Sequence, residues 1–334
     1  MKRIIVLSIA FLIIIFNFTS CKIKSDSDLY YRDDMNKYIT VGEYNLTVDA
    51  DSEALEKYKY VFQKQHFSET LVQTLTEGTV QKWDTVEIDY MCKLNGEMID
   101  EASEHGCSIT VGTDDFILDG FEDKLIGCKI GYTAQIDYSV PEDFVVEQIS
   151  GKDVVFDVFV AKVDRYNSPD DNSAKKAGFE NLSDYEKQRD DFAVSTMLFN
   201  RIYDIVEFNS WPEKETTALL DSLLSRYRKE CEANGSTLDD LAASYKMSME
   251  EFKDTLIEVI QKNYSNMPRD MVSYWILSKY DEPLTQKDVS ATRTVIISEI
   301  DTSLEDAGYS DIEIQRRSAY EKALSVLLKS AEVK

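Results

Sequence analysis

The apolar residues of this chain are spaced in two different ways, and the change of spacing near residue 170 restricts the folds that the chain can form. Between residues 81 and 166, apolar and polar side chains alternate, as along 86–90, and a period of two is typical of half-buried β-strands. After residue 174, apolar side chains recur at every third or fourth position, as along 219–227, which is typical of amphipathic helices. A stretch of strands followed by a stretch of helices predicts an α+β fold.

Turn and capping signals give these stretches their expected boundaries. The Asn95-Gly96 pair predicts a hairpin turn between two strands, and the polar run 167–173 predicts a boundary between domains. Four Ser/Thr-x-x-Asp/Glu pairs predict helix starts, namely Ser183–Glu186, Thr237–Asp240, Ser248–Glu251 and Thr285–Asp288. The predicted segments are a signal peptide (1–20), a tether (21–37), a strand–helix segment (38–80), a β domain (81–166) and a helical domain (174–334).

The N-terminus resembles the signal peptide of a bacterial lipoprotein. Lys2 and Arg3 precede an almost wholly apolar run, 4–16, which is shorter than the roughly 20 residues that span a bilayer. The sequence FTSC that ends at Cys21 resembles a lipobox, in which the Cys thiol receives a diacylglyceryl group and becomes the mature N-terminus. We therefore expect lipidation at Cys21 and an extracytoplasmic protein that is lipid-anchored to the bacterial cell membrane. Phe18 replaces the usual Leu, and the alternative is an ordinary signal peptide or an uncleaved anchor with Cys21 there by chance.

The charge of the chain limits its partners. Its formal net charge is −25 and its pI is about 4.5, whereas binding to nucleic acid needs a basic surface. We therefore expect no nucleic-acid partner and no electrostatic docking on anionic lipid, so that a membrane attachment has to be covalent or hydrophobic. Hydrophobic residues make up 43% of the chain, enough for a sizeable core.

The cysteines and histidines show no pattern of a metal site or of a hydrolase. Cys92, Cys107, Cys128 and Cys231 form no CxxC pair and no His/Cys ligand spacing, so we expect no metal and no cofactor. The chain has 2 histidines, and neither lies in a nucleophile motif with Ser or Cys. We expect the four thiols to be free and mostly buried.

A series of short blocks resembles the FKBP-type prolyl isomerase family, in the version carried by trigger factor. The blocks read TVEIDY (85–90), NGEMID (95–100), VG (111–112), FILDGFEDKLIG (116–127), PEDF (141–144) and GKDVVFDV (151–158). This resemblance covers roughly residues 81–164, and a weaker one links 38–62 and the helices after 180 to the trigger-factor body. It implies an FKBP-like antiparallel sheet domain inserted in an all-helical, trigger-factor C-terminal-like chaperone body, in which 38–80 and 174–334 pack together.

The resemblance also implies a site for the twisting of Xaa–Pro bonds. Amide resonance opposes the twist with a barrier of about 18–20 kcal/mol, and an apolar cleft favours the less charge-separated twisted amide. The implied catalytic residues are Tyr90, Asp100, Ile117 through its backbone N–H, and Phe121 as the floor of the cleft. The implied substrate-binding residues are Ile99, Phe116, Phe144 and Phe156. The alternative for each aromatic side chain is plain β-sheet core.

Three departures from the family pattern weaken the enzymatic interpretation. Cys92 stands where Gly is usual, Ile99 replaces an aromatic residue, and Asp119 replaces Pro. Our interpretation is an extracytoplasmic folding factor, a prolyl isomerase with chaperone activity on unfolded or newly exported chains that carry Xaa–Pro bonds. A catalytically inactive FKBP-fold holdase and a surface structural lipoprotein are the alternatives. We expect no ribosome binding, because the basic Gly-Phe-Arg signature of trigger factor does not occur in the chain.

Overall fold

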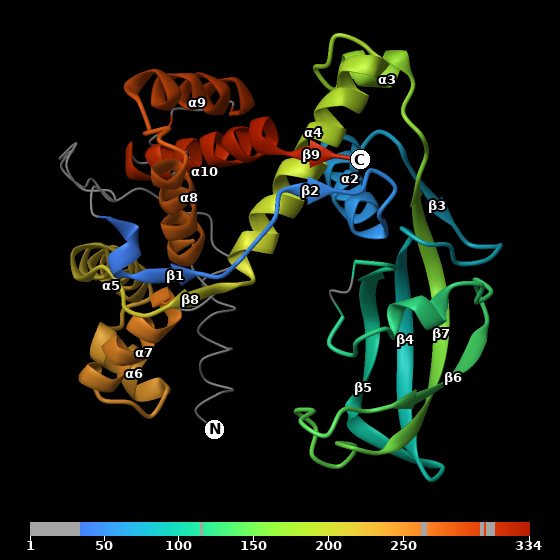
Figure 1. Cartoon of the computed structure of the whole chain (residues 1–334). Coiled ribbons are helices and arrows are strands. Elements are labelled where there is room, and N and C mark those ends of the chain that lie inside the picture. The colour runs from blue at the N-terminus through green and yellow to red at the C-terminus, as the bar shows by residue number, and fades with distance from the viewer. Residues whose placement is uncertain (1–33, 114–115, 262–265, 301–303, 305–310) are drawn as a thin grey trace. The chain divides into compact units, whose positions relative to one another are not determined.

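The computed structural model confirms the α+β class and describes residues 34–113, 116–261, 266–300, 304 and 311–334 (Figure 1). The predicted signal peptide, Cys21 and most of the predicted tether lie outside these residues. The chain divides into two compact units. Unit 2 is Asp49–Val194, and unit 1 contains the described residues up to Val48 together with Ser195–Lys334.

Unit 2 is built on an antiparallel sheet in which the strands follow the order β3-β7-β4-β5, with β6 also paired to β7. Its strands are β3 (Val72–Leu75), β4 (Thr85–Leu94), β5 (Glu97–Thr110), β6 (Thr133–Ser139) and β7 (Asp153–Tyr166). Its helices are α2 (Glu53–Phe67), the short η2 (Glu122–Leu125), α3 (Asp171–Lys176) and the first part of α4 (Leu182–Tyr203).

The hairpin between β4 and β5 turns at Asn95-Gly96, as predicted. Both residues have positive φ angles, 54° and 88°, which a two-residue hairpin turn of this hand requires and which Asn and Gly tolerate best. Leu94 pairs with Glu97 directly across the turn. Farther along, the register of the two strands shifts on both sides of Tyr90, so that Tyr90 lies opposite Glu104.

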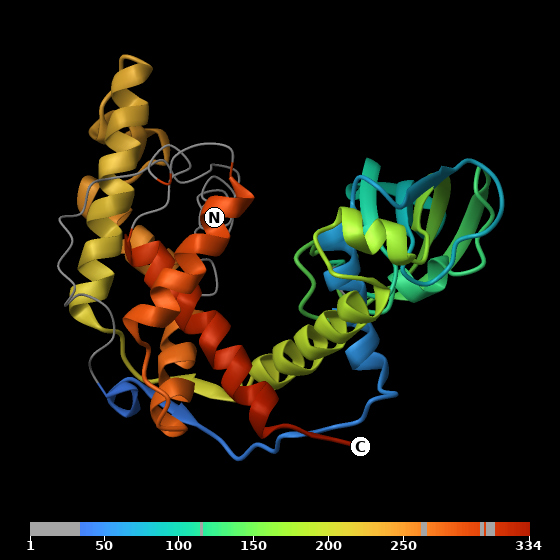
Figure 2. The same ribbon diagram turned by 90° about the horizontal axis from the view of Figure 1, so that it is seen from above.

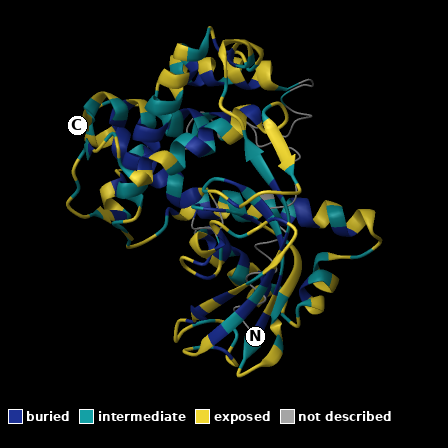
Figure 3. Ribbon diagram, turned by 90° about the vertical axis from the view of Figure 1, so that its right-hand side faces the viewer, coloured by how far each residue is buried: buried dark blue, intermediate teal, exposed yellow. Residues whose placement is uncertain are grey.

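One face of the sheet carries the core of unit 2. Alternate residues of β4 and β7, such as Val86, Ile88, Val158 and Val160, are buried, and their neighbours in the sequence face outward. Figure 3 shows this alternation of buried and exposed residues along the strands. The period of two seen in the sequence therefore corresponds to one buried face.

A second apolar cluster of unit 2 joins α2 to the helices that follow the sheet. Phe62 and Phe67 of α2 pack with Phe179 and Tyr185, and the Phe67 and Tyr185 rings lie 5.2 Å apart. The chain then leaves α2 and enters β3, which pairs with the C-terminal end of β7. The predicted segment 38–80 is thus divided, because its N-terminal strands pair within unit 1 whereas α2 and β3 lie in unit 2.

Unit 1 is mainly helical. Its helices are η1 (Met35–Lys37), the rest of α4, α5 (Glu213–Ala233), α6 (Leu238–Ser244), α7 (Met249–Gln261), α8 (Met267–Lys279), α9 (Gln286–Glu299) and α10 (Asp311–Ser330). Its strands form two small pairs, β1 (Ile39–Val41) with β8 (Val206–Phe208), and β2 (Thr47–Val48) with β9 (Glu332–Val333). Helices α8 and α10 cross in contact (Figures 1 and 2), and Arg316 of α10 donates to the fully buried Asp270 of α8.

Three of the four predicted capping boxes are confirmed, at Thr237–Asp240, Ser248–Glu251 and Thr285–Asp288. The prediction of a helix start at Ser183 is wrong, because α4 begins at Leu182 and the Asn181 side chain accepts from the backbone N–H of Asp184 at 3.0 Å. Among the described residues, no helix is both long enough and apolar enough to cross a bilayer.

Candidate functional site

A tight turn places Phe121 at the centre of the candidate site. Gly120 has a φ of +71°, which only glycine adopts without strain, and the backbone N–H of Phe121 donates to the carbonyl of Leu118 at 3.0 Å. Phe121 then leads directly into η2. The turn directs the Phe121 ring into the core of the sheet, where its side chain is fully buried.

Four aromatic rings surround that of Phe121. Phe116 and Phe156 lie at 5.1 Å between ring centroids, Tyr138 at 6.0 Å and Tyr90 at 6.4 Å. Tyr90 comes from β4, Tyr138 from β6 and Phe156 from β7, whereas Phe116 comes from the loop after β5. The structure therefore brings together four of the predicted site residues, Tyr90, Phe116, Phe121 and Phe156, in one aromatic cluster.

The carboxylate of Glu122 holds the loop before Phe121. Glu122 is buried, and it accepts the backbone N–H groups of Gly112 and Thr113 at 3.0 Å and that of Phe116 at 2.9 Å. Each of these is a charge-assisted hydrogen bond. From the other side, the Lys57 ammonium of α2 donates to the carbonyl of Thr113. The loop is thus fixed at Thr113 and at Phe116, and these contacts position Phe116 and Ile117.

Ile117 follows Phe116 in the loop before η2. Its side chain is 63% exposed, and its backbone N–H meets no acceptor among the described residues. An unpaired N–H beside an apolar cluster is a donor ready for a carbonyl group of a ligand. Phe116 lies directly before it and packs on Phe121, inclined to it by 33°.

The carboxylate beside Tyr90 is that of Glu104 and not that of Asp100. The Tyr90 hydroxyl donates to Oε2 of Glu104 at 3.1 Å, whereas Asp100 lies on the exposed side of β5. Burial raises the pKa of the Tyr90 hydroxyl, and the hydrogen bond to Glu104 raises that pKa further. The predicted role of Asp100, a carboxylate near the twisting amide, stays a prediction.

The remaining predicted residues line the same core from its edges. Ile99 and Phe144 are half-buried and pack against it, and Ile99 pairs with Cys92 across the β4–β5 ladder. Two further residues were missed from the sequence. Tyr138 was recognisable, because it alternates with exposed neighbours along β6. In the structure its hydroxyl donates to the carbonyl of Asp119 at 2.7 Å. Glu122 gave no signal beyond its place after Phe121.

The thiols of the described residues are free, as predicted, and two of the four, Cys92 and Cys231, are buried. Burial raises the pKa of the Cys92 thiol to about 11. Among the described residues, no group of three or more His, Cys, Asp or Glu side chains has the arrangement of a metal site. The aromatic cluster, the free N–H of Ile117 and the pair of Tyr90 with Glu104 therefore make up the candidate site.

Comparison with known families agrees with this geometry. Residues 76–161 match the FKBP-type peptidyl-prolyl cis-trans isomerase family, a range that contains the whole aromatic cluster and most of the sheet. The predicted FKBP-type sheet domain is thereby confirmed, between segments that are mainly helical.

Similar proteins are trigger factors. That of Pelotomaculum thermopropionicum is 28% identical over 57% of this chain and 46% of its own length, and that of Acetivibrio thermocellus is 24% identical over 88% and 73%. Trigger factor 1 of Desulfitobacterium hafniense is 36% identical over 40% of this chain and 31% of its own. The chain spans about half the length of the first curated relatives it matches. It is trigger-factor-like and carries an FKBP-type isomerase domain.

One solved structure, of the trigger factor chaperone in a study of substrate recognition in folding and assembly, covers 90% of this chain and 72% of its own. Its sequence identity is 17% and its TM-score is 0.27.

Proposed function

We propose that the protein is an extracytoplasmic folding factor that catalyses cis–trans isomerisation of Xaa–Pro bonds and binds unfolded, newly exported chains. The observation that carries the proposal is the ring cluster around Phe121, with the unpaired backbone N–H of Ile117 at its edge. These two features are what a prolyl ring and its neighbouring carbonyl group require.

Catalysis by such a site needs neither a nucleophile nor a proton transfer. The planar amide is more charge-separated than the twisted one, so that moving the bond from water to an apolar cleft lowers the barrier to rotation. The N–H of Ile117 would hold the substrate carbonyl, and the rings of Tyr90 and Phe156 would enclose the proline. Uncatalysed exchange takes tens to hundreds of seconds, long enough to limit folding.

The buried state of Phe121 favours one alternative. Phe121 has no exposed surface, because four rings enclose it, so a prolyl ring reaches Phe121 only when one of them moves. Phe116 is the half-buried one of the four, and the other three are buried. A protein in which Phe116 never moves would grip unfolded chains through the exposed Ile117 without isomerising them. This is the inactive holdase, and its distinguishing property is chaperone activity without catalysis.

The chaperone half of the proposal draws on the trigger-factor relatives and on the mainly helical unit 1. The extracytoplasmic setting draws on the sequence alone, namely the apolar run 4–16 and the lipobox that ends at Cys21. Mass spectrometry of the mature protein tests the setting. We expect an N-terminal Cys21 that carries a diacylglyceryl group, and an intact Met1 would contradict the proposal.

The isomerase is tested by exchange of a short Xaa–Pro peptide with the full chain. We expect acceleration by the wild type and about a tenfold loss of kcat/KM in Phe121→Leu, the equivalent of about 1.4 kcal/mol of transition-state stabilisation. Phe159→Leu is the matched control, because Phe159 lies on the outer face of β7 and is partly exposed. Absence of acceleration together with suppressed aggregation of an unfolded client would establish the holdase, and absence of both would leave the structural lipoprotein.

A further inference from the structure

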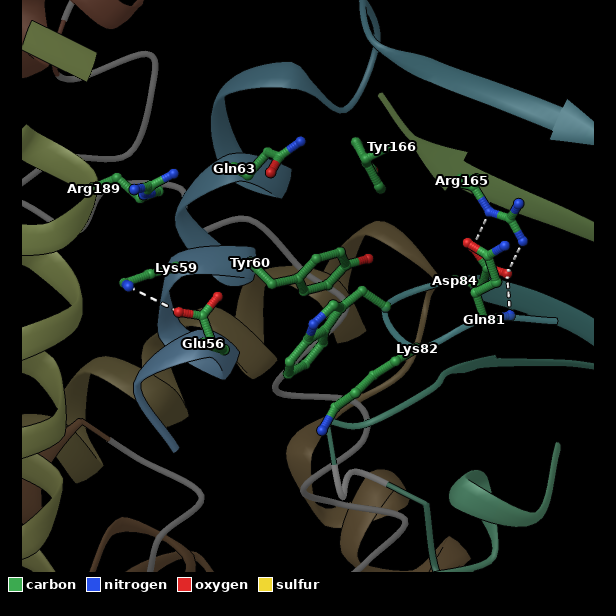
Figure 4. A pocket seen from close by; sticks show the side chains of 11 residues that line it. Glu56, Lys59, Tyr60, Gln63, Gln81, Lys82, Asp84, Arg165, Tyr166 and Arg189 are labelled. Carbon is green, nitrogen blue, oxygen red and sulfur yellow. Dashed lines mark hydrogen bonds and ion pairs between the residues drawn. The ribbon is translucent and has the colours of Figure 1, made fainter. Parts of the chain in front are cut away.

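A separate cavity of about 230 Å³ lies within unit 2, where α2 meets the beginning of β4 and the end of β7. Glu56, Lys59, Tyr60 and Gln63 of α2 line it, and in Figure 4 Lys59 points to the side of Arg189, away from Tyr60. The other lining side chains used below are Trp83, Asp84, Arg165, Tyr166 and Arg189. The FKBP-type site described above uses none of them.

Three aromatic rings form the apolar wall of this cavity. The rings of Tyr60 and Trp83 are stacked at 5.2 Å with an angle of 18°, and Tyr166 meets Tyr60 edge-on at 5.9 Å. Trp83 has a φ of +71°, which is unusual for a bulky residue and is held by the hydrogen bond from its N–H to the carbonyl of Val111 at 2.9 Å. Strained residues of this kind concentrate at binding sites.

The charged part of the lining has more cations, Lys59, Lys82, Arg165 and Arg189, than carboxylates, Glu56 and Asp84. The buried Asp84 carboxylate is saturated, because it accepts two hydrogen bonds from Arg165 and one from the backbone N–H of Gln81, each at 2.7 Å. The hydroxyl of Tyr60 is buried and lies beside the hydroxyls of Thr85 and Thr110. An anionic group on a ligand therefore complements the excess of cations in this lining.

The remaining cations have surface carboxylates as partners, and the Arg189 guanidinium also lies 5.8 Å from the centre of the Tyr185 ring. Lys59 pairs with Glu56 at 2.8 Å, and Arg189 pairs with its neighbour Asp190 at 2.8 Å. The carboxylates of both pairs are about half exposed, and ion pairs that reach solvent contribute about 0–1 kcal/mol, so that a better-placed carboxylate can replace them. Lys82 lies 5.0 Å from the centre of the Trp83 ring, which adds a further positive charge beside the aromatic wall.

We propose that this cavity binds an acidic segment of an extended polypeptide, with an aromatic side chain against Trp83 and a carboxylate at Lys59 and Arg189. The volume is below the about 300–1,000 Å³ of pockets that enclose whole small ligands, and it suits one side chain of a longer chain. The choice of a polypeptide as the occupant rests on the proposed function.

The test uses the full chain labelled with 5-fluorotryptophan. The chain has 3 tryptophans, and each gives a separate ¹⁹F signal. The Trp83→Phe variant identifies the signal of Trp83. The probes are two capped pentapeptides without proline, ADFEA and its uncharged counterpart ANFQA. We expect ADFEA to shift the Trp83 signal saturably and to leave the signals of Trp211 and Trp275 in place, and ANFQA to bind about tenfold more weakly.

Variants locate the binding. Arg189→Gln is expected to weaken the affinity for ADFEA about tenfold. Lys175→Gln is the matched control, at an exposed lysine paired with Asp171, and is expected to leave that affinity unchanged. Equal shifts by both peptides, no shift of Trp83, or no effect of Arg189→Gln would overturn the proposal. The Phe121→Leu variant separates the two sites, because its kcat/KM for isomerisation is expected to fall about tenfold while the shift of Trp83 is kept.

Discussion

The rings of Phe116 and Phe121 lie 5.1 Å apart and are inclined by 33°, so that the loop before η2 covers the residue that the sequence predicts as the floor of the cleft. The contact is made by one loop residue, and the loop itself is tied to Glu122. The side chain of Phe116 can therefore turn away while the backbone beneath it stays in place. Access to Phe121 depends on that rotation.

Replacing Phe116 by Ala is expected to expose Phe121. A ring pair of this kind contributes about 0.5–1.5 kcal/mol, so the affinity for a prolyl peptide should rise about 2- to 10-fold. Isothermal titration with a short Xaa–Pro peptide measures the change. A weaker affinity would mean that Phe116 forms part of the binding wall, as the sequence predicts, and that it does not act as a cover.

Replacing Glu122 by Gln is expected to destabilise unit 2 by about 1–3 kcal/mol, because an amide cannot accept all the N–H groups that the carboxylate accepts. Chemical denaturation, monitored through a spectroscopic signal of the β-sheet, measures the loss in the free energy of unfolding. The neighbouring Asp123 is exposed, and Asp123→Asn is the matched control, which should change stability by less than about 0.5 kcal/mol. Equal effects of the two variants would refute the anchoring role.

A double-mutant cycle identifies the carboxylate that is coupled to Tyr90. Tyr90→Phe combined with Glu104→Gln should give a coupling of about 0.5–1 kcal/mol, a value reduced by the exposure of Glu104. The same cycle with Asp100→Asn should give no coupling. Urea denaturation of the single and double variants supplies the free energies, and a larger coupling of Tyr90 to Asp100 than to Glu104 would contradict the contact seen in the structure.

The reactivity of Cys92 should depend on folding and on pH. A pKa of about 11 leaves about one thiol in a thousand ionised at pH 8, against about a quarter in the unfolded chain. Folding raises the pKa of this thiol. The contribution of the protonated thiol to the free energy of unfolding is therefore complete below about pH 8.5 and is lost as the pH rises through 11. Alkylation with iodoacetamide at pH 8, located by mass spectrometry, should reach the half-buried Cys128 before Cys92. Early labelling of Cys92 would contradict its burial.

Local patterns were sufficient to predict much of the fold. The alternation along β4, β6 and β7 and the Asn95-Gly96 turn are properties of neighbouring residues, and the structure shows them as expected. The aromatic cluster followed from the order of the sequence blocks. Its roles in catalysis and binding stay predictions.

Features that depend on distant residues could not be predicted. β3 carries no alternation, and it becomes a strand only because the end of β7 offers it a free edge. The meeting of Tyr90 with Glu104 depends on two shifts of register in the β4–β5 ladder, which no local pattern reveals. The start of α4 was misplaced because Asn181, which is no part of a Ser/Thr box, caps it.

The position of β3 determines which truncated fragments of this protein keep its sheet intact. β7 is shared, since β6 pairs with its first half and β3 with its last residues, 163–166. A fragment that starts at residue 81 would lose β3 and leave that end of β7 as an unprotected edge, which invites aggregation between copies. A fragment of residues 49–194 keeps the edge covered, and it should remain monomeric where the shorter one associates.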